Sequence, residues 1–311
     1  MKISIIILSW NTKKLLKDCL KSVFAQKLGP NSLEVIVVDN ASTDGSPEMV
    51  RREFKQVKLI KNQENLGFAK GNNQGIKIAK GDLIMLLNSD TVVQKGAIRK
   101  LIDSFPKQDQ LKAISPLLIL PNHQPQIDYY MKFPNLWQVF LYHNPVLRPL
   151  ALKIVFFRHF ICFSPKQEPF KVDQLPGAAL MASKKTWNKI GLLDEDFHFL
   201  FEDADWCYRA RRLGCQFLVI PEAKVIHLGG ASWKKKLKEE SFDFYKQYFS
   251  SMLLFVEKNY GSFKKLIFRI ALIKNWLFSS LLLLPIAAFS PRVWQKVLDK
   301  LKLIKYFLIV K

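Results

Sequence analysis

Three short groups of polar residues come directly after runs of apolar, largely β-branched or aliphatic residues. Ser9 and Asn11 follow the first run, Asp39 ends the second, and Asn88-Ser89-Asp90 follows a later one. If these runs are parallel strands, their carboxyl ends share one edge of a sheet, where open α/β sheets bind ligands. A carboxylate there can hold a divalent cation or a ribose hydroxyl. The groups therefore predict one common binding site.

Some of these polar residues also have a structural interpretation. Ser42, Thr43 and Asp44, which follow Asp39, could cap a helix or form a turn. Asn88-Ser89-Asp90 could be an ordinary turn after a strand. Asp39 is harder to explain in this way, because the sequence offers its carboxylate no local group to cap. We therefore interpret Asp39 as a ligand-binding residue.

A further acidic group, Glu202-Asp203-Ala204-Asp205, lies among aromatic residues. The helix dipole stabilises acids in a first helical turn, and Asp205 precedes Arg209 by the four residues typical of a helix salt bridge. Three acids within four residues exceed what a helix start requires. A carboxylate in apolar surroundings has a raised proton affinity, which suits a general base.

His227 ends another apolar run, in the segment VIHLGG. A single histidine at the end of a strand is more often a structural group than a ligand. Its neutral imidazole could nevertheless complete a metal site with Asp90.

Two common phosphate-binding motifs are absent from the sequence. No GxGxxG follows the first apolar run, and no GxxxxGK[ST] occurs anywhere. The charge of a phosphate ligand would then need another counterion, and a divalent metal on Asp90 is the simplest one.

Apolar runs and amphipathic segments alternate through the first 120 residues. This alternation predicts an α/β fold with a mostly parallel sheet. The predicted strands are 3–8, 34–39, 57–60, 83–87 and 113–120, and the predicted helices are 15–24, 46–54, 68–79 and 96–105. After the insertion, regular structure is predicted to return at 175–182, followed by short helices, strands at 217–220 and 225–228, and a helix at 235–258.

The composition excludes several classes of protein. With 311 residues, of which 49% are hydrophobic, the chain can bury a large core. No run of 18 uncharged apolar residues occurs, which argues against a polytopic membrane protein. The four cysteines show no CxxC spacing, which argues against a zinc ribbon and favours a reducing compartment. The first apolar run is too short for a signal peptide, so we expect a cytoplasmic location.

The net charge of +22 is concentrated near the carboxyl end. Residues 258–311 contain eleven Lys and Arg but one acid, Asp299, together with Trp276, Phe278 and Phe289. This mixture favours an anionic membrane surface over nucleic acid, for which no recognition module is present. A basic, solvated helix packed on the domain is the alternative. Residues 121–172, rich in proline and aromatic residues, read as an insertion that covers a site or contacts lipid.

Taken in order, six segments between residues 2 and 230 resemble the family 2 glycosyltransferases of the GT-A fold, and most of all their bacterial rhamnosyltransferase-like branch. The segments are SIIILSWN, VVDNASTDGS, NLGFAKGNNQGI, LLNSDT, PGAALMASKKTWNKIGLLDEDFHFLFEDADWCYRARRLG and VIHLGG. The resemblance implies a GT-A domain over residues 1–260, with 121–172 as an acceptor- or membrane-facing insertion. Residues 261–311 would be a basic helical tail that associates with membranes.

The resemblance also implies roles for individual residues. Asp203 would be the catalytic base, and Glu202 would orient it or bind the acceptor. Asp90, with His227, would hold Mg²⁺ or Mn²⁺ on the donor diphosphate. Asn88 takes the place of the first Asp of the family's DxD motif, which would weaken metal binding. The nucleotide sugar would contact Ser9, Asn11, Asp39, Asn65, Gly67, Phe68, Asn73 and Asn88.

The implied activity is an inverting, metal-dependent sugar transfer. The donor would be dTDP-rhamnose or a UDP-sugar, and the acceptor a lipid-linked or cell-envelope glycan at the inner face of the cell membrane. One alternative is a sugar-phosphate nucleotidyltransferase. That enzyme would need a phosphate-binding loop rich in glycine and basic residues after the first strand, and the segment SWNTKK at this place matches such a loop poorly. Another is an inactive, membrane-docked binding module, against which the presence of Asp90, Glu202, Asp203 and His227 argues.

Overall fold

The computed structural model describes residues 1–105, 111–198, 200–229 and 241–309. The chain forms two compact units, each made of two separate segments. Unit 1 comprises Met1–Tyr130 and Ser164–Lys235, and unit 2 comprises Met131–Phe163 and Lys236–Lys311. This division differs from the expected boundary after residue 260. The physical reason is aromatic packing within unit 2, where Phe133 stacks on Phe255 and the imidazole of His143 lies edge-on to Phe249.

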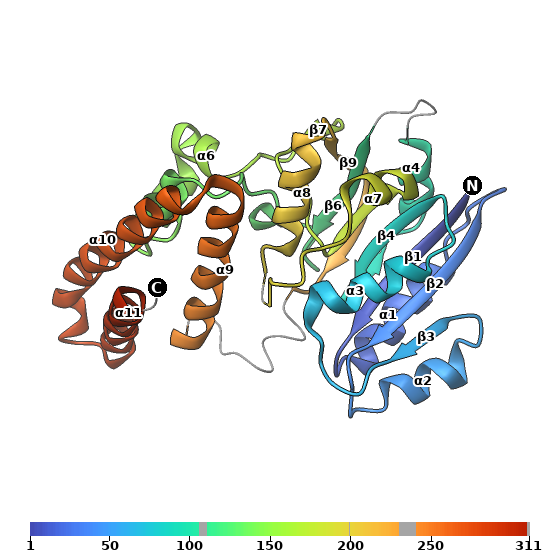
Figure 1. Ribbon diagram of the computed structural model, residues 1–311, viewed down its shortest axis with the longest axis horizontal. Helices are drawn as coiled ribbons and strands as arrows, with labels where there is room; N and C mark the ends of the chain where they lie inside the picture. Colours follow the sequence, from blue (N-terminus) through green and yellow to red (C-terminus); the bar gives the residue numbers. More distant parts are fainter. Residues whose placement is uncertain (106–110, 199, 230–240, 310–311) are drawn as a thin grey trace. The chain divides into compact units, whose positions relative to one another are not determined.

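Unit 1 is built on one sheet with the order β3-β2-β1-β4-β8-β6-β9-β5, and β7 pairs with β9 (Figure 1). Its first four strands are parallel: β1 (Lys2–Ser9), β2 (Ser32–Asp39), β3 (Lys58–Lys61) and β4 (Leu83–Asn88). Ile3, Ile5, Ile6 and Ile7 of β1 are fully buried, as expected for a strand covered on both faces.

The second half of the sheet is mixed. Strand β8 (Ala179–Ser183) runs antiparallel between β4 and β6 (Lys112–Ile119), and β6 pairs in parallel with β9 (Gln216–His227). The short strands β5 (Thr91–Val93) and β7 (Phe170–Lys171) are antiparallel to β9. The predicted α/β fold with a mostly parallel sheet is confirmed. Strand β5 was not predicted.

Strand β9 is one continuous element where the sequence predicted two. Its pairing with β6 shifts register, so that Pro116 is opposite Ile220 and Leu117 is opposite Lys224. The residues skipped by this irregularity begin with Pro221, which has no backbone N–H to donate to a ladder. The bulge lets the strand pass the proline and continue to His227.

The helices of unit 1 connect these strands: α1 (Lys13–Phe24), α2 (Ser46–Glu53), α3 (Gly67–Ile78), α4 (Ala97–Asp103), α7 (Lys184–Ile190) and α8 (Glu202–Arg212). Gly71 and Gly75 let α3 lie close to β1, because a Cβ atom at these positions would collide with the side chains of Leu8 and Ile6. The short 3₁₀ helix η1 (Ile127–Tyr129) also belongs to unit 1.

Unit 2 is helical. It contains the π-helix η2 (Gln138–Tyr142), α5 (Arg148–Lys153), α6 (Val155–Ile161), α9 (Phe242–Tyr260), α10 (Ser262–Ala287) and α11 (Pro291–Ile309). Helices α9, α10 and α11 pack against one another (Figure 1). Asn144 donates to the side-chain oxygen of Asn275 over 2.9 Å, and both side chains are buried. The helix predicted at 235–258 is described from Phe242, and its first residues lie outside the described part of the chain.

Candidate active site

The ends of the parallel strands bring the predicted polar residues together. Ser9 is the register partner of Asp39 between β1 and β2, and Leu8 is the partner of Asn88 between β1 and β4. The hydroxyl of Thr12 lies 3.0 Å from the hydroxyl of Ser9 and donates to that of Ser89 over 3.0 Å. A chain of buried hydroxyl groups thus links the ends of β1 and β4. Thr12 was not among the predicted site residues.

Asp39 is fully buried, and its two carboxylate oxygens differ. Oδ1 accepts a hydrogen bond of 2.8 Å from the backbone N–H of Ser42, so the expectation that it has no local group to bind was wrong. Oδ2 is buried and has no hydrogen-bond partner. Burial raises the pKa of Asp39 above its usual value. Because an unmet buried acceptor is costly, Oδ2 is well suited to accept a hydrogen bond from a ligand.

Asn11 joins the loops that follow β1 and β2. Its backbone N–H donates to the hydroxyl of Ser42, and its Oδ1 accepts from the backbone N–H of Thr43 over 2.8 Å. Asn11 has a positive φ of 53°, a conformation that asparagine tolerates better than most residues. The side chain of Asn11 therefore orders the loop beside Asp39.

The amide of Asn40 connects this loop to the start of α3. It donates to Asn65 Oδ1 over 3.3 Å and to the carbonyl of Gly67 over 3.0 Å. Gly67 has a positive φ of 81°, which a residue with a Cβ atom rarely adopts. Asn65 and Gly67 are thus placed beside the end of β2.

Asn73 makes a different set of contacts from the rest of the predicted group. Its Nδ2 donates to the carbonyl of Leu193 and to Glu195 Oε1, both over 2.9 Å, and its Oδ1 accepts from the N–H of Leu193. These bonds tie α3 to the loop before α8.

The turn at Gly177 contacts three of the predicted residues: Phe68, Asn88 and Asp203. A Cβ atom there would lie 3.1 Å from the ring of Phe68 and 3.4 Å from the Cβ of Asp203. The next residue, Ala178, accepts a hydrogen bond of 2.9 Å from the backbone N–H of Asn88. This turn therefore connects the end of β4 to the start of α8. The sequence analysis quoted Gly177 within a motif but gave it no role.

Asp203 and Glu202, at the start of α8, have different surroundings. The oxygens of Asp203 accept backbone N–H bonds from Gly177 (2.7 Å) and Ala204 (2.8 Å). Glu202 is buried, and its Oε2 has no hydrogen-bond partner. Leu200 and Phe201, directly before them, have positive φ angles of 61° and 71°. Such conformations cost free energy in non-glycine residues and concentrate at functional sites.

The two acids also titrate differently. Burial and, to a smaller extent, the negative charge of Asp203 together raise the pKa of Glu202 to about 8. Burial raises the pKa of Asp203 as well, but the hydrogen bonds that its carboxylate accepts from the backbone oppose this change. Asp203 therefore ionises first, and its charge keeps a proton on Glu202.

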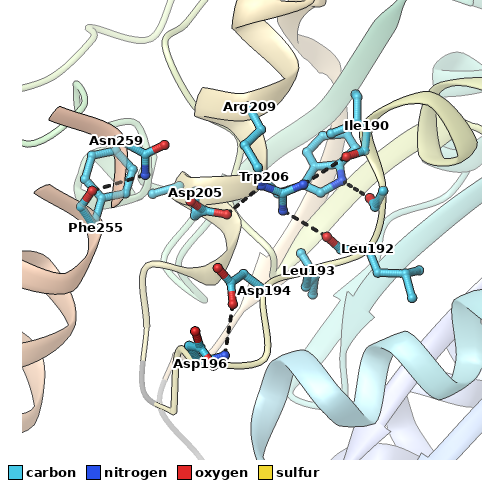
Figure 2. Close-up of polar contacts among 12 residues, drawn as sticks. Ile190, Leu192, Leu193, Asp194, Asp196, Asp205, Trp206, Arg209, Phe255 and Asn259 are labelled. Atoms are coloured by element: carbon cyan, nitrogen blue, oxygen red, sulfur yellow. Dashed lines mark hydrogen bonds and ion pairs between the residues drawn. The ribbon is translucent and has the colours of Figure 1, made fainter. Parts of the chain in front are cut away.

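Asp205 forms the helix salt bridge that its spacing predicted. Its Oδ2 accepts from Nε of Arg209 over 2.8 Å, while the guanidinium also donates to the carbonyls of Ile190 and Leu192, each over 2.9 Å (Figure 2). Glu202 is not part of this network: its Oε2 is buried and has no hydrogen-bond partner.

His227 lies beside Asp90, as predicted, and also beside Asn88. Its Nε2 is 3.4 Å from Asp90 Oδ1 and 3.4 Å from Asn88 Nδ2. The other ring nitrogen, Nδ1, lies 3.0 Å from Oε1 of Gln126, whose Nε2 donates to the carbonyl of His227 over 2.8 Å. Tyr129 packs edge-on against the imidazole. Gln126 and Tyr129 lie in the predicted insertion, whose composition did not reveal this contact.

These bonds determine the tautomer of His227. The amide group of Gln126 donates to the carbonyl of His227, so its oxygen is the atom that faces Nδ1. An amide oxygen only accepts, and Nδ1 must therefore carry the proton. In the neutral imidazole, the lone pair of Nε2 then lies on the side of Asp90. The carboxylate oxygen of Asp90 and the lone pair of Nε2 repel each other at 3.4 Å unless a cation or a proton lies between them.

The residues present fit a divalent cation with two protein ligands. Within the described residues, no group of three or more His, Cys, Asp and Glu side chains could hold a metal by itself. A metal at Asp90 and His227 would take its remaining ligands from water and from an anionic substrate, as Mg²⁺ commonly does with substrate phosphates.

Comparison with known proteins agrees with this geometry. Residues 4–115 match the family model described as "Glycosyl transferase family 2". Over these residues the chain thus matches the family 2 glycosyltransferases. The matched region contains the ends of β1, β2 and β4, whereas Asp203 and His227 lie beyond it.

Curated relatives match over about one third of the chain. Glycosyltransferase GlyG of Streptococcus pneumoniae is 31% identical over 110 residues, which is 34% of this chain and 36% of that protein. Poly(ribitol-phosphate) beta-glucosyltransferase of Bacillus spizizenii is 33% identical over 114 residues, covering 35% of this chain and 18% of that enzyme. The matched part thus spans well under half of these relatives.

Solved structures share the fold. The mannosyltransferase PcManGT of Pyrobaculum calidifontis, in complex with GDP-Man and Mn²⁺, has a TM-score of 0.59 at 14% identity, over 98% of this chain and 87% of that one. TarS of S. aureus (residues 1–349) has a TM-score of 0.52 at 16% identity, over 88% and 70%. The chain therefore adopts the expected GT-A fold.

Proposed function

We propose that this chain is an inverting glycosyltransferase that moves a sugar from a nucleoside-diphosphate donor to a glycan hydroxyl. The observation that carries the proposal is how Asn88 is placed. Its side chain lies 3.4 Å from His227, and the Gly177 turn connects its backbone to Asp203, in a chain whose residues 4–115 match family 2. The buried acceptor Asp39, the acidic metal ligand Asp90 and the candidate base Asp203 thus lie on connected elements.

The donor binds across the ends of β1, β2 and β4. Asp39 Oδ2, which has no partner in the protein, accepts a hydrogen bond from the base or ribose. Ser9, Asn11, Asn65 and Gly67 shape the surroundings of that contact. Phe68 and Asn88 both lie beside the Gly177 turn, where the sugar and diphosphate would bind. Asn73 acts indirectly, because its amide group holds the loop before α8.

Asp90 and His227 hold a divalent cation, Mg²⁺ or Mn²⁺, in this proposal. When bound, the cation neutralises charge on the donor diphosphate. Asn88 contributes a neutral amide where related motifs have a carboxylate, so the binding is expected to be weaker.

Asp203 acts as the general base. Its two backbone hydrogen bonds fix the carboxylate, and each oxygen keeps a second lone pair with which it can take the proton of an acceptor hydroxyl. Glu202, which keeps its own proton at neutral pH, orients Asp203 or the acceptor. A single displacement from the face opposite the nucleotide inverts the anomeric carbon.

The proposed acceptor is a lipid-linked or cell-envelope glycan at the inner face of the cell membrane. Support comes from the poly(ribitol-phosphate) beta-glucosyltransferase relative and from TarS, which has also been solved with UDP-GlcNAc. Both dTDP-rhamnose and UDP-sugars are candidate donors. Thermal-shift measurements with a panel of nucleotide sugars, with and without Mn²⁺, test the proposal. Stabilisation by none of them, followed by no transfer to glycan acceptors, would favour an inactive binding module.

Asp90→Ala should remove the metal dependence of nucleotide binding. The wild-type chain is expected to bind nucleoside diphosphates more tightly in Mn²⁺ or Mg²⁺ than in EDTA, because Asp90 supplies the charged ligand. Calorimetry of both chains in both conditions measures the difference. Equal affinity of the wild-type chain in Mn²⁺ and in EDTA would contradict the metal role. Asp82→Ala, at the other end of β4, is a control that should keep the dependence.

Gln126→Leu should weaken Mn²⁺ binding by about 10- to 100-fold, the usual effect of losing a residue that orients a histidine ligand. The substitution removes the acceptor that keeps the proton on Nδ1 of His227. Titration of Mn²⁺ followed by electron paramagnetic resonance, without any sugar, reads the effect directly. Gln124→Leu, which replaces a nearby exposed glutamine, should bind Mn²⁺ normally. Unchanged affinity in Gln126→Leu would show that the tautomer does not matter.

A further inference from the structure

Helix α10 of unit 2 has two unlike faces. One face is buried and includes Phe268, Leu272 and Trp276 together with the polar residues Asn275, Ser279 and Ser280. It packs against α9, α11 and η2. The other face is exposed and, apart from Lys274, apolar. We call the following set the α10 stripe: Phe263, Leu266, Ile270, Leu277, Phe278 and Leu281, each 44–75% exposed.

An exposed apolar stripe of this length marks an interaction surface. At about 1.5 Å per residue, Phe263 and Leu281 are roughly 27 Å apart along the helix. The only charged residue of the described chain on the same face between them is Lys274.

The charge of unit 2 indicates what covers the stripe. Its described residues include fifteen Lys and Arg but only three acids, Asp243, Glu257 and Asp299. A second copy of the same unit would bring like charges together, which opposes association. An anionic lipid surface complements both properties, because it accepts apolar side chains among its acyl chains and basic ones among its headgroups.

The position of Lys274 indicates how the helix lies. Helix α10 is long and apolar enough to cross a membrane, with a mean hydropathy of 1.7 in its best window, but only 39% of that window is buried in the protein. Lys274 is at the middle of the helix, so a crossing helix would hold this charge at the centre of the bilayer, where charges are costly. In a helix parallel to the membrane, Lys274 can extend its ammonium group to the headgroups.

We propose that the α10 stripe docks on an anionic lipid bilayer with α10 parallel to the membrane plane. The inference rests on the membrane location proposed above, but not on sugar transfer. Vesicle binding can therefore be measured without donor or acceptor. Donor binding, measured on the same samples, reports separately on the proposed function.

Point substitutions test this surface better than removal of residues 262–311. Such a truncation would also remove Asn275, the partner of Asn144, and Trp276, which packs against Phe249. The full-length variant Phe278→Ser with Leu281→Ser should lose at least about tenfold in partition to vesicles containing phosphatidylglycerol, because two large side chains no longer enter the lipid. Vesicles of phosphatidylcholine alone should bind the wild-type chain much more weakly.

The matched control is Ile78→Ser with Leu213→Ser, which removes two comparably exposed side chains from unit 1 (41% and 46%). This control should bind vesicles like the wild-type chain. Equal binding of the stripe variant and the wild type would overturn the proposal, as would failure of the wild type to bind anionic vesicles. A wild-type dimer in light scattering that the stripe variant abolishes, without vesicle binding, would assign the surface to a second copy.

Fluorescent labels at Leu266→Cys, Leu277→Cys and Leu284→Cys test the orientation. All four native cysteines are buried, so an introduced exposed thiol can be labelled selectively. Quenching by brominated lipids should give similar, shallow depths at the three positions. A clearly deeper label at residue 277 than at residues 266 and 284 would indicate a crossing helix and overturn the parallel arrangement.

Discussion

Asp203→Asn should lose sugar transfer by about 10²- to 10⁴-fold, the usual contribution of a general base, while keeping most of its donor affinity. The amide group cannot accept the proton of the acceptor hydroxyl. It also places an NH₂ group against one of the two backbone N–H groups, those of Gly177 and Ala204, from which Asp203 now accepts hydrogen bonds. Transfer rate, donor affinity and thermal stability should therefore be measured for the same preparation.

The neighbouring acids are the controls. Glu202→Gln should have a much smaller effect on transfer at neutral pH, because burial and the charge of Asp203 raise the pKa of Glu202 to about 8 and the residue is already protonated there. Asp205→Asn should act mainly on stability, since Asp205 is bound to Arg209. Substantial transfer by Asp203→Asn together with an inactive Glu202→Gln would move the base to Glu202.

Arg209→Met should destabilise unit 1 by about 3 kcal/mol, the lower part of the range for removing one partner of a buried ion pair. The substitution leaves the carboxylate of Asp205, which is 3% exposed, without its cation, and the carbonyls of Ile190 and Leu192 lose their donor. Arg209→Lys should recover only part of this loss, because an ammonium group lacks the planar fork that reaches all three partners. Urea unfolding measures the free-energy changes.

Arg211→Met, two residues further along α8, is the matched control. Arg211 also binds an acid, Asp173, but the arginine side chain is 57% exposed, and exposed pairs contribute about 0–1 kcal/mol. Similar losses for the two variants would show that burial of Asp205 does not control the stability of this helix. In Arg209→Met with Asp205→Leu, part of the loss should be recovered, because no unpaired buried charge remains.

Local patterns in the sequence were sufficient to predict most of unit 1. The four parallel strands and the helices α1 to α4 lie within a few residues of the predicted ranges, because each is a buried apolar run or an amphipathic stripe bounded by polar turns. The salt bridge between Asp205 and Arg209 followed from helix spacing alone. The proximity of Asp39, Asn88 and Ser9 followed from the shared edge of parallel strands.

Features that depend on contacts between distant segments were not predicted. Strand β5 exists because Thr91–Val93 pair with the end of β9, more than a hundred residues away. The continuity of β9 through Pro221 depends on a bulge opposite β6. The contact of Gln126 with His227 has no signal in spacing or composition. Likewise, the free oxygen of Asp39 could be found only by counting its hydrogen bonds.

The composition of unit 2 from two separate segments has a consequence during translation. Residues Met131–Phe163 leave the ribosome before their packing partners, and the seventy-two residues from Ser164 to Lys235 must be synthesised in between. At roughly 5–20 residues per second, this takes roughly 4–14 seconds. Throughout that interval Phe133 and His143 lack the aromatic side chains of α9 that cover them in the folded protein. The nascent chain thus exposes aromatic side chains, which can bind chaperones or lipid, before its carboxyl-terminal helices have been synthesised.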